Sequence, residues 1–238
     1  MAAVSEHYAN HLAPIYLWMV GGIESAVSQG KADLAALLPG SGLAIDLGAG
    51  LGMHSIPLAQ GGYQVVAIDQ SPLLLSVLQE HSPGLPVRII EANLLEFRAL
   101  VPDPSDLIIC MGDTLTHLES FEQVQVLLES VAQSLSPKGR FVATFRDYST
   151  AAAGDGRFIQ VRSDDTRILT CFLEEEPRHI KVHDIVHDRR DGQWQMSISS
   201  YRKLRIAPSA VEQMLRSLGM NVQVERGPRG MVRIEANA

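Results

Sequence analysis

A run of glycines between an apolar segment and a helix-like segment constrains this chain more than any other feature. Residues 43–47 are apolar enough for a buried strand, and Gly48, Gly50 and Gly52 follow directly. Glycine lets a backbone approach a ligand closely, and the N-terminus of a following helix offers unpaired N–H groups with a positive partial charge. The pattern predicts a strand, a nucleoside-binding turn and a helix.

Apolar runs and helix-like segments go on alternating as far as residue 146. This alternation is typical of a parallel sheet with helices on both faces, so we expect an α/β fold. Strands are predicted at residues 43–47, 64–68, 87–90, 107–111 and 141–145, and helices at 53–60, 72–81 and 121–135, the last closed by a turn at 136–139.

The remaining segments have a different texture and suggest four parts. Residues 1–40 read as an added helical segment, in which Leu34, Leu37 and Leu38 have the spacing of one helix face. Residues 41–150 form the α/β core. Residues 151–206 read as an antiparallel β insertion, with strands at 157–161, 166–173, 179–186 and 193–203, and residues 207–238 as a helix at 208–218 and a hairpin of 221–225 with 231–235.

Two acidic residues narrow the kind of nucleoside. The second predicted strand leads into Asp69, whose carboxylate can accept hydrogen bonds from both hydroxyls of a ribose. A dinucleotide fingerprint needs its third glycine where Met53 stands. Asp46, two residues before the first glycine, adds negative charge that suits a sulfonium or ammonium ligand better than a phosphate. Met53 at the position of the third glycine and the negative charge of Asp46 both disfavour a pyrophosphate.

Four segments carry a family resemblance: residues 46–52, 66–71, 92–95 and 135–141 resemble the class I S-adenosylmethionine-dependent methyltransferases of the small-molecule type. The resemblance covers about residues 40–150, and the terminal helix and hairpin are similar to the family's antiparallel last strand. It implies a Rossmann-like sandwich with a mostly parallel sheet, interrupted here by the antiparallel insertion. It also implies S-adenosylmethionine as the cofactor.

The same resemblance implies the cofactor contacts. Asp46 and the glycine turn would face the methionine part, Asp69 the ribose, and Asn93 with Leu94 the adenine. Asn93 stands where the family often has Asp, but an amide carbonyl can still accept a hydrogen bond. The full set of expected contacts is Asp46, Gly48, Ala49, Gly50, Gly52, Asp69, Gln70, Asn93, Leu94 and Met111.

We expect the reaction site beside the carboxyl ends of the fourth and fifth predicted strands, because ligands of open α/β sheets lie there. Asp113 and His117 are the candidate catalytic residues. His117 could act as a base if the acceptor must lose a proton, since an imidazole titrates near neutrality. Alternatively, His117 caps or packs at the start of the helix beginning near Ser120, and Asp113 closes a loop.

Aromatic residues gather in the first 18 positions, where Tyr8, Tyr16 and Trp18 lie. A helix that carries them could fold over the cofactor as a lid and exclude water, with Tyr8 and Tyr16 the better candidates because a phenol offers a face and a hydrogen bond. Core packing of an added helix is the alternative. The residues expected to face the acceptor are Tyr8, Tyr16, Arg146, Tyr148, Tyr201 and Arg202.

Three histidines at a spacing of four, His179, His183 and His187, raise the question of a metal site. In a strand this spacing places neighbours about 13 Å apart, too far for one ion to bridge, so no metal is expected. The cysteines Cys110 and Cys171 are too few for a secreted disulfide scaffold. Reduced thiols in the cytoplasm are the simplest interpretation.

The charge balance limits the partners. The chain has 20 Lys and Arg against 27 Asp and Glu, and no basic run, so nucleic acid is a poor candidate. The apolar run at 13–22 is shorter than the roughly 20 residues of a membrane span and lacks the basic start of a signal peptide, so neither a membrane nor secretion is expected. We expect a monomer or a homodimer.

Together these features predict methyl transfer from S-adenosylmethionine to the N or O of a small-molecule acceptor. The β insertion resembles that of glycine N-methyltransferase-like and related metabolite enzymes. Two alternatives stay open: a non-catalytic S-adenosylmethionine-binding sensor or subunit, and an NAD-dependent oxidoreductase.

Overall fold

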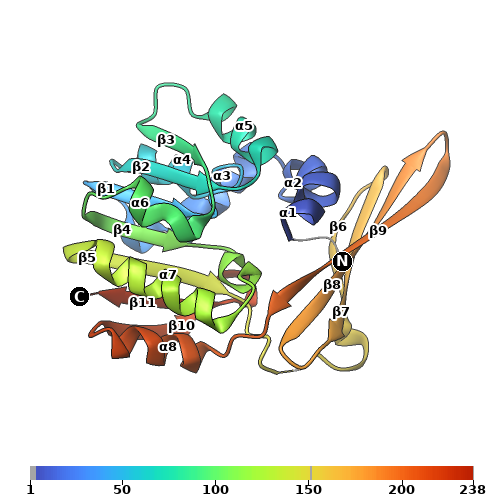
Figure 1. Ribbon diagram of the computed structural model, residues 1–238. Coiled ribbons are helices and arrows are strands. Elements are labelled where there is room, and N and C mark those ends of the chain that lie inside the picture. Colours follow the sequence, from blue (N-terminus) through green and yellow to red (C-terminus); the bar gives the residue numbers. More distant parts are fainter. Residues whose placement is uncertain (1–3, 151, 238) are drawn as a thin grey trace.

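A seven-stranded sheet forms the body of the protein in a computed structural model that describes residues 4–150 and 152–237 (Figure 1). Its strand order is β10-β11-β5-β4-β1-β2-β3. Strands β1 to β5 pair with one another in parallel, whereas β11 runs antiparallel to both β5 and β10. The strands are β1 (Leu43–Leu47), β2 (Gln64–Asp69), β3 (Val87–Glu91), β4 (Ser105–Cys110), β5 (Leu135–Phe145), β10 (Asn221–Arg226) and β11 (Val232–Asn237). The Rossmann-like α/β fold is confirmed.

Helices cover both faces of this sheet because the side chains of a buried strand alternate between two apolar faces. One face packs Ile45, Ile108 and Phe141 against α6 (Phe97–Leu100), α7 (Phe121–Ser134) and α8 (Pro208–Ser217). The other packs α3 (Ile23–Asp33), α4 (Ser55–Gln60) and α5 (Pro72–His81).

Local sequence explains where the longer helices begin. The Ser71 hydroxyl accepts from the backbone N–H of Leu74 and Pro72 occupies the first turn of α5. Ser120 caps α7 in the same way, its hydroxyl accepting from the N–H of Gln123. These caps fix the loops that end on the cofactor side of the sheet.

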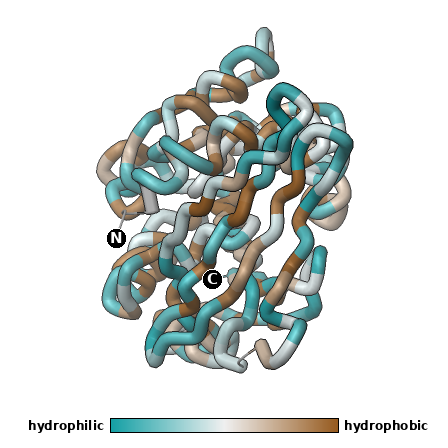
Figure 2. The backbone as a smooth tube through the Cα atoms, turned by 90° about the vertical axis from the view of Figure 1, so that its right-hand side faces the viewer, coloured by the Kyte–Doolittle hydropathy of each residue, from teal (hydrophilic) through white to brown (hydrophobic). Residues whose placement is uncertain are grey.

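A second, antiparallel sheet stands beside the first with the order β6-β7-β8-β9. Its strands are β6 (Phe158–Ser163), β7 (Arg167–Glu175), β8 (His179–Arg190) and β9 (Gln193–Leu204). Figure 2 looks onto this sheet and shows hydrophobic segments spaced along its strands. The predicted meander is present, but β8 and β9 extend into a longer hairpin than the sequence suggested.

The N-terminal helices lie between the two sheets (Figure 1). They are α1 (Val4–His7), a π-helical turn (Tyr8–Leu12) and α2 (Ala13–Met19). Leu12 and Ile15 pack against Leu169 and Val186 of the second sheet. The segment is therefore helical as predicted, and it fastens the second sheet to the body.

The structure corrects some predicted boundaries. Leu34 and Leu37 do not share a helix face: α3 ends at Asp33, and both leucines are buried around a 3-10 turn (Ala35–Leu37) beneath the main sheet. The predicted turn at 136–139 belongs to β5, which begins at Leu135 with a register shift against β4. Tertiary packing decides these boundaries, where local propensity is weak.

Across the described residues 4–150 and 152–237, no helix is long and apolar enough to cross a membrane. Both cysteines are free thiols: Cys110 is buried and Cys171 is partly buried. Burial raises the pKa of the Cys110 thiol to about 12, so it stays protonated.

Candidate active site

A cavity of about 850 Å³ opens at the carboxyl ends of β1, β2, β4 and β5. The main sheet contributes the glycine turn and the loops after these strands. The N-terminal helices contribute Tyr8 and Tyr16, and the second sheet contributes Asp184, Tyr201 and Lys203. The cavity is large enough for a nucleoside cofactor together with a small acceptor.

The glycine turn forms one wall of this cavity. Gly48 and Gly50 have φ angles of +81° and +54°, which favour glycine. A Cβ on Gly48 would lie 2.4 Å from the Cγ2 of Thr114. A Cβ on Gly50 would come no nearer than 3.7 Å to the Cδ1 of Leu74 and would take up cavity space instead. The turn is thus shaped for a ligand that touches its backbone.

Asp69 stands beside this turn at the end of β2. One carboxylate oxygen accepts from the backbone N–H of Gly50 and the other from the N–H of Ser71, both at 2.8 Å. Burial raises the pKa of the Asp69 carboxyl above its ordinary value. Each oxygen has a further lone pair, so the carboxylate can also accept from ribose hydroxyls. The residues at the turn and at Asp69 therefore fit a nucleoside cofactor.

Most of the expected cofactor contacts lie on the cavity wall. Asn93 is the N-cap of a 3-10 turn, where its side-chain oxygen accepts from the N–H of Leu95 at 3.0 Å and its amide NH₂ is left for a ligand. The predicted residues that line the cavity are Gly48, Ala49, Gly50, Asp69, Gln70, Asn93, Leu94 and Met111.

Asp46 and Gly52 do not line the cavity, contrary to the prediction. The Asp46 carboxylate is buried behind the turn and accepts from the Ser55 hydroxyl at 2.6 Å. A Cβ on Gly52 would lie 2.4 Å from the Cδ1 of Leu78. Asp46 therefore ties β1 to the start of α4, and Gly52 lets α5 pack closely, so both residues shape the turn from behind the cavity wall.

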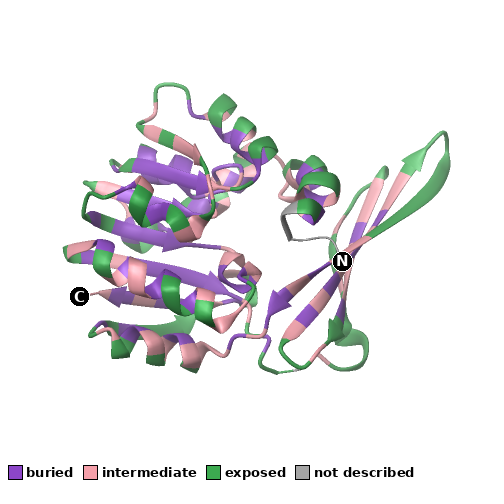
Figure 3. Ribbon diagram, viewed as in Figure 1, coloured by how far each residue is buried: buried purple, intermediate pink, exposed green. Residues whose placement is uncertain are grey.

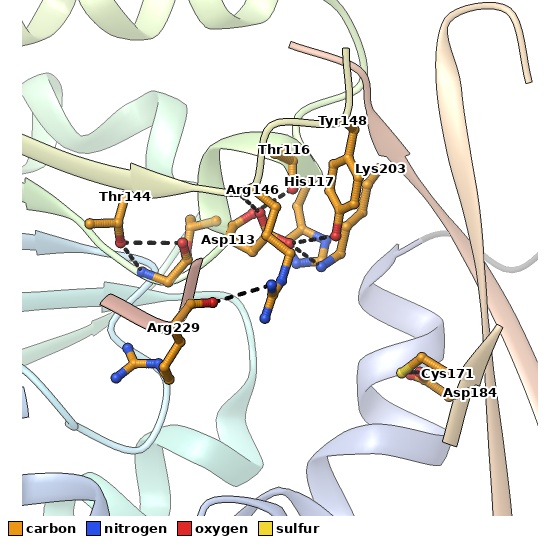
Figure 4. A network of polar contacts seen from close by, with 12 residues as sticks. Asp113, Thr116, His117, Thr144, Arg146, Tyr148, Cys171, Asp184, Lys203 and Arg229 are labelled. Atoms are coloured by element: carbon orange, nitrogen blue, oxygen red, sulfur yellow. Dashed lines mark hydrogen bonds and ion pairs between the residues drawn. The ribbon is translucent and has the colours of Figure 1, made fainter. Parts of the chain in front are cut away.

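Asp113, after β4, holds a polar cluster at the other end of the cavity (Figure 4). The ammonium of Lys203 and the hydroxyl of Tyr148 both donate to one carboxylate oxygen, the latter at 3.1 Å. The backbone N–H of Arg146 donates to the other at 2.9 Å. Burial opposes the charge of Asp113, but Lys203 and these donors bring its pKa below the ordinary value. Burial likewise opposes the charge of Lys203, yet Asp113 and nearby tyrosine hydroxyls raise the pKa of Lys203 well above its ordinary value.

His117 lies in the same part of the cavity. Its ring stacks on Tyr201 with centroids 5.5 Å apart, and its Nε2 is 3.3 Å from the Tyr8 hydroxyl. Burial, reinforced by the charge of Lys203, lowers the pKa of His117 to about 3. A neutral imidazole with so low a pKa is a weak base near neutral pH. The structure therefore favours a positioning role over the predicted base, and it leaves the capping of α7 to Ser120.

The N-terminal tyrosines adopt the predicted position over the cavity. Tyr8 and Tyr16 both line it, with ring centroids 6.4 Å apart. Trp18 does not line it: its indole N–H donates to Asp164, and its ring lies under the guanidinium groups of Arg162 and Arg167. Of the three aromatic residues near the N-terminus, Tyr8 and Tyr16 thus line the cavity, whereas Trp18 packs against the second sheet.

Four residues were predicted to face the acceptor from beyond β5, and Arg202 was placed wrongly. Arg146, Tyr148 and Tyr201 line the cavity. Arg202 instead forms a two-pronged ion pair with Glu176, because alternation along β9 turns it to the opposite face from Tyr201.

Lys203 and Asp184 are two charged residues of the cavity that were not predicted from the sequence. Strand alternation could have predicted Lys203, because the residue two positions after Tyr201 lies on the same face of β9. Asp184 lies in the buried row of β8 that also contains Ile180 and Val182, where a carboxylate stands out. Its oxygens accept from Nε2 of His7 at 2.9 Å and from Sγ of Cys171 at 2.8 Å.

Comparisons with known proteins agree with this geometry. Residues 44–139 match a family model described as a methyltransferase domain. Glycine N-methyltransferase of Rattus norvegicus is 30% identical over 190 residues, which cover 71% of this chain and 65% of that enzyme. The chain therefore spans just under two thirds of the length of this relative.

Two solved structures share the fold over nearly the whole chain. The CcbJ methyltransferase from Streptomyces caelestis has a TM-score of 0.81 at 18% identity and coverage of 98% for both chains. CalS10, an amino pentose methyltransferase from Micromonospora echinaspora whose structure contains bound SAM, has a TM-score of 0.75 at 15% identity, with 95% of this chain and 96% of that chain covered.

The fold and the cavity define a doubly wound α/β protein with a nucleoside cofactor site at the carboxyl edge of its sheet. The methyltransferase-domain match over residues 44–139 and these neighbours identify the fold as that of the class I S-adenosylmethionine-dependent methyltransferases. S-adenosylmethionine is the cofactor of this family. Nothing in the comparisons supports the oxidoreductase or the sensor.

Proposed function

We propose that this protein transfers a methyl group from S-adenosylmethionine to the nitrogen of a small-molecule amine. The observation that carries the proposal is that the glycine turn and the Asp113 cluster open into one cavity, in which His117, the imidazole beside Asp113, is a weak base. The cavity volume of about 850 Å³ leaves room for a small acceptor beside the cofactor.

Nitrogen is favoured over oxygen by the protonation states around the acceptor position. An alcohol must lose its proton to become a good nucleophile, whereas a neutral amine already has a lone pair. The pKa of His117 is lowered to about 3, and a raised pKa keeps Lys203 protonated. The carboxylates of Asp113 and Asp184 are too weakly basic to ionise an alcohol, but they can hold an amine by hydrogen bonds.

The residues of the cavity divide the work of the reaction. S-adenosylmethionine, when bound, supplies a methyl group on a positively charged sulfur. Asp69 and the glycine turn hold the nucleoside, while Tyr8 and Tyr16 cover the cavity and exclude water. The amine lone pair forms the new N–C bond as the S–C bond breaks, and the resulting ammonium then releases a proton. Positioning by these groups supplies the rate without a strong base.

Similar proteins support an amine acceptor. The rat relative is a glycine N-methyltransferase, and CalS10 acts on an amino pentose. Arg146, Tyr148 and Tyr201 line the part of this cavity that an acceptor would fill. We assign these three side chains, together with Asp113 and Lys203, to acceptor binding.

The test pairs each candidate amine with its hydroxyl analogue. Purified protein is incubated with S-adenosylmethionine and a panel of amino acids, amino sugars and simple amines, each beside the compound in which OH replaces NH₂. We expect release of S-adenosylhomocysteine and a mass gain of one methylene with the amine alone. Methylation of the hydroxyl partner at a comparable rate would contradict the assignment to nitrogen.

A further inference from the structure

The β8–β9 hairpin carries an exposed apolar row away from the cavity. Trp194, Met196 and Ile198 alternate along β9, so they share one face of the second sheet. They are 46%, 61% and 53% exposed. Figure 3 shows the hairpin projecting from the body as an exposed arm. Large apolar side chains gathered in this way mark an interaction surface.

The backbone edge beside this row is open as well. β9 is the outermost strand of its sheet, and among the described residues only β8 pairs with it. An unpaired edge invites a further strand, and proteins usually block such an edge with charged side chains. Residues 193–200 contain no charged side chain at all.

The other sheet edges follow the usual rule. β10 carries Glu225 and Arg226, β3 carries Arg88 and Glu91, and β6 carries Arg162. The uncharged stretch of residues 193–200 is therefore longer than any on the three other edge strands, and the charges of β9, Arg202 and Lys203, lie nearer the body.

We propose that β9 pairs with β9 of a second copy of this chain, in antiparallel fashion about a two-fold axis at Met196. A two-fold axis places identical stretches of edge together, so a charged edge would repel itself, whereas the uncharged edge of residues 193–200 does not. A partner of different sequence would impose no such requirement.

The apolar row fixes the register. Pairing about Met196 sets Trp194 of one chain opposite Ile198 of the other and Met196 opposite its own copy, so all three apolar side chains meet apolar partners. Gln195 then lies opposite Ser197 on the other face. If the two-fold axis is moved by one residue along β9 in either direction, one apolar side chain of each chain lies opposite a glycine or a serine of the other. The two second sheets join into one continuous sheet, and the cavity stays open.

The first experiment measures mass in solution by size-exclusion chromatography with light scattering. We expect the wild type at twice the 26.0 kDa of the chain. Met196→Lys places two ammonium groups against each other and should raise the dimer dissociation constant at least about tenfold. Val224→Lys is the matched control, because Val224 is 41% exposed on the edge strand β10. It should leave the dimer intact.

The second experiment tests the register without relying on a destabilised variant. Directly opposed residues have Cα atoms about 4.5–5.5 Å apart, within the range of a disulfide. Met196→Cys should therefore form a cross-linked dimer under mild oxidation. Ile198→Cys alone should not, because its copy lies about 13 Å away along the strand. The wild type controls for Cys110 and Cys171.

Three results would overturn the proposal: a monomeric wild type, a dimer that Met196→Lys leaves as tight as before, or a Met196→Cys variant that cross-links no better than Ile198→Cys. A dimer broken by Met196→Lys but not by Val224→Lys, with cross-linking specific to Met196→Cys, supports it.

Discussion

The ammonium of Lys203, near the end of β9, contacts the carboxylate of Asp113, just after β4, in a buried ion pair. These residues belong to different sheets, so the pair joins the second sheet to the main sheet at the proposed acceptor position. The hydroxyl of Tyr148 donates to the same carboxylate. Any change here should affect the joining of the two sheets and the proposed acceptor site together.

Removing Lys203 should destabilise the protein strongly. Lys203→Met leaves Asp113 buried without its counter-charge, and loss of one partner from a buried pair costs about 3–5 kcal/mol. Urea unfolding followed by circular dichroism measures this loss. Arg202→Met is the matched control, since Arg202 pairs with Glu176 on the exposed face of the same strand. Comparable losses for the two variants would contradict the contrast drawn between them.

Asp69 should carry much of the affinity for the nucleoside. Asp69→Ala removes hydrogen bonds to a charged acceptor, each worth about 1.5–3 kcal/mol, so binding of S-adenosylhomocysteine should weaken at least about tenfold. Isothermal titration calorimetry gives the dissociation constant. Glu91→Ala is the control: Glu91 is exposed and pairs in register with Asp69 on β3. If both variants bind equally well, Asp69 does not hold the ribose.

Substitution of Gly50 should distinguish the effect of backbone strain from the exclusion of a ligand by a new Cβ. Gly50→Ala and Gly84→Ala both force alanine into a left-handed conformation, at φ angles of +54° and +74°, which costs about 1–2 kcal/mol. The Cβ on residue 50 takes up cavity space, whereas a Cβ on residue 84 meets no atom within 4 Å and lies outside the cavity. The midpoint temperature of thermal unfolding should fall in both variants, but the affinity for S-adenosylhomocysteine should fall only in Gly50→Ala. A loss of affinity in Gly84→Ala would show that strain alone explains it.

Stability should depend on pH through His117. Burial lowers the pKa of His117 to about 3, below the ordinary value of about 6.5, so the folded state binds fewer protons than the unfolded state between these values. The effect of His117 on the free energy of unfolding is therefore absent above pH 6.5, and the protein loses stability as the pH falls from 6.5 toward 3.

The measurement is urea unfolding between pH 7 and 5. Stability of the wild type should fall by up to about 1.4 kcal/mol per pH unit more than that of His117→Gln. His81→Gln, at the partly exposed end of α5, should retain the dependence of the wild type. Parallel profiles for the wild type and His117→Gln would show that His117 titrates normally in the fold.

Much of the cofactor half could be predicted from the sequence. Residues 43–47 and 72–81 have the bounds that their local patterns indicated, because a buried strand and a capped helix are specified by neighbouring residues. Glycines with positive φ and an acid after the second strand are also local features. Asp46 was misplaced because a motif gives the position of a side chain along the chain but not the direction in which it points.

The acceptor half depended on contacts between distant segments. Lys203 meets Asp113 across 90 positions, and Tyr8 meets His117 across 109. The pKa of His117 follows from its burial among these partners, so the reason it is a weak base could not be read from the residues near it in the sequence.

The sequence by itself determined the α/β class, the glycine turn and the carboxylate beside it, because each depends on residues close together along the chain. Only the tertiary structure decided that Lys203 and not Arg202 enters the cavity, that burial lowers the pKa of His117, and that β9 lies at the edge of its sheet. These depend on which face of a strand is covered and on how far a charge lies from water, and both are set by packing between sheets.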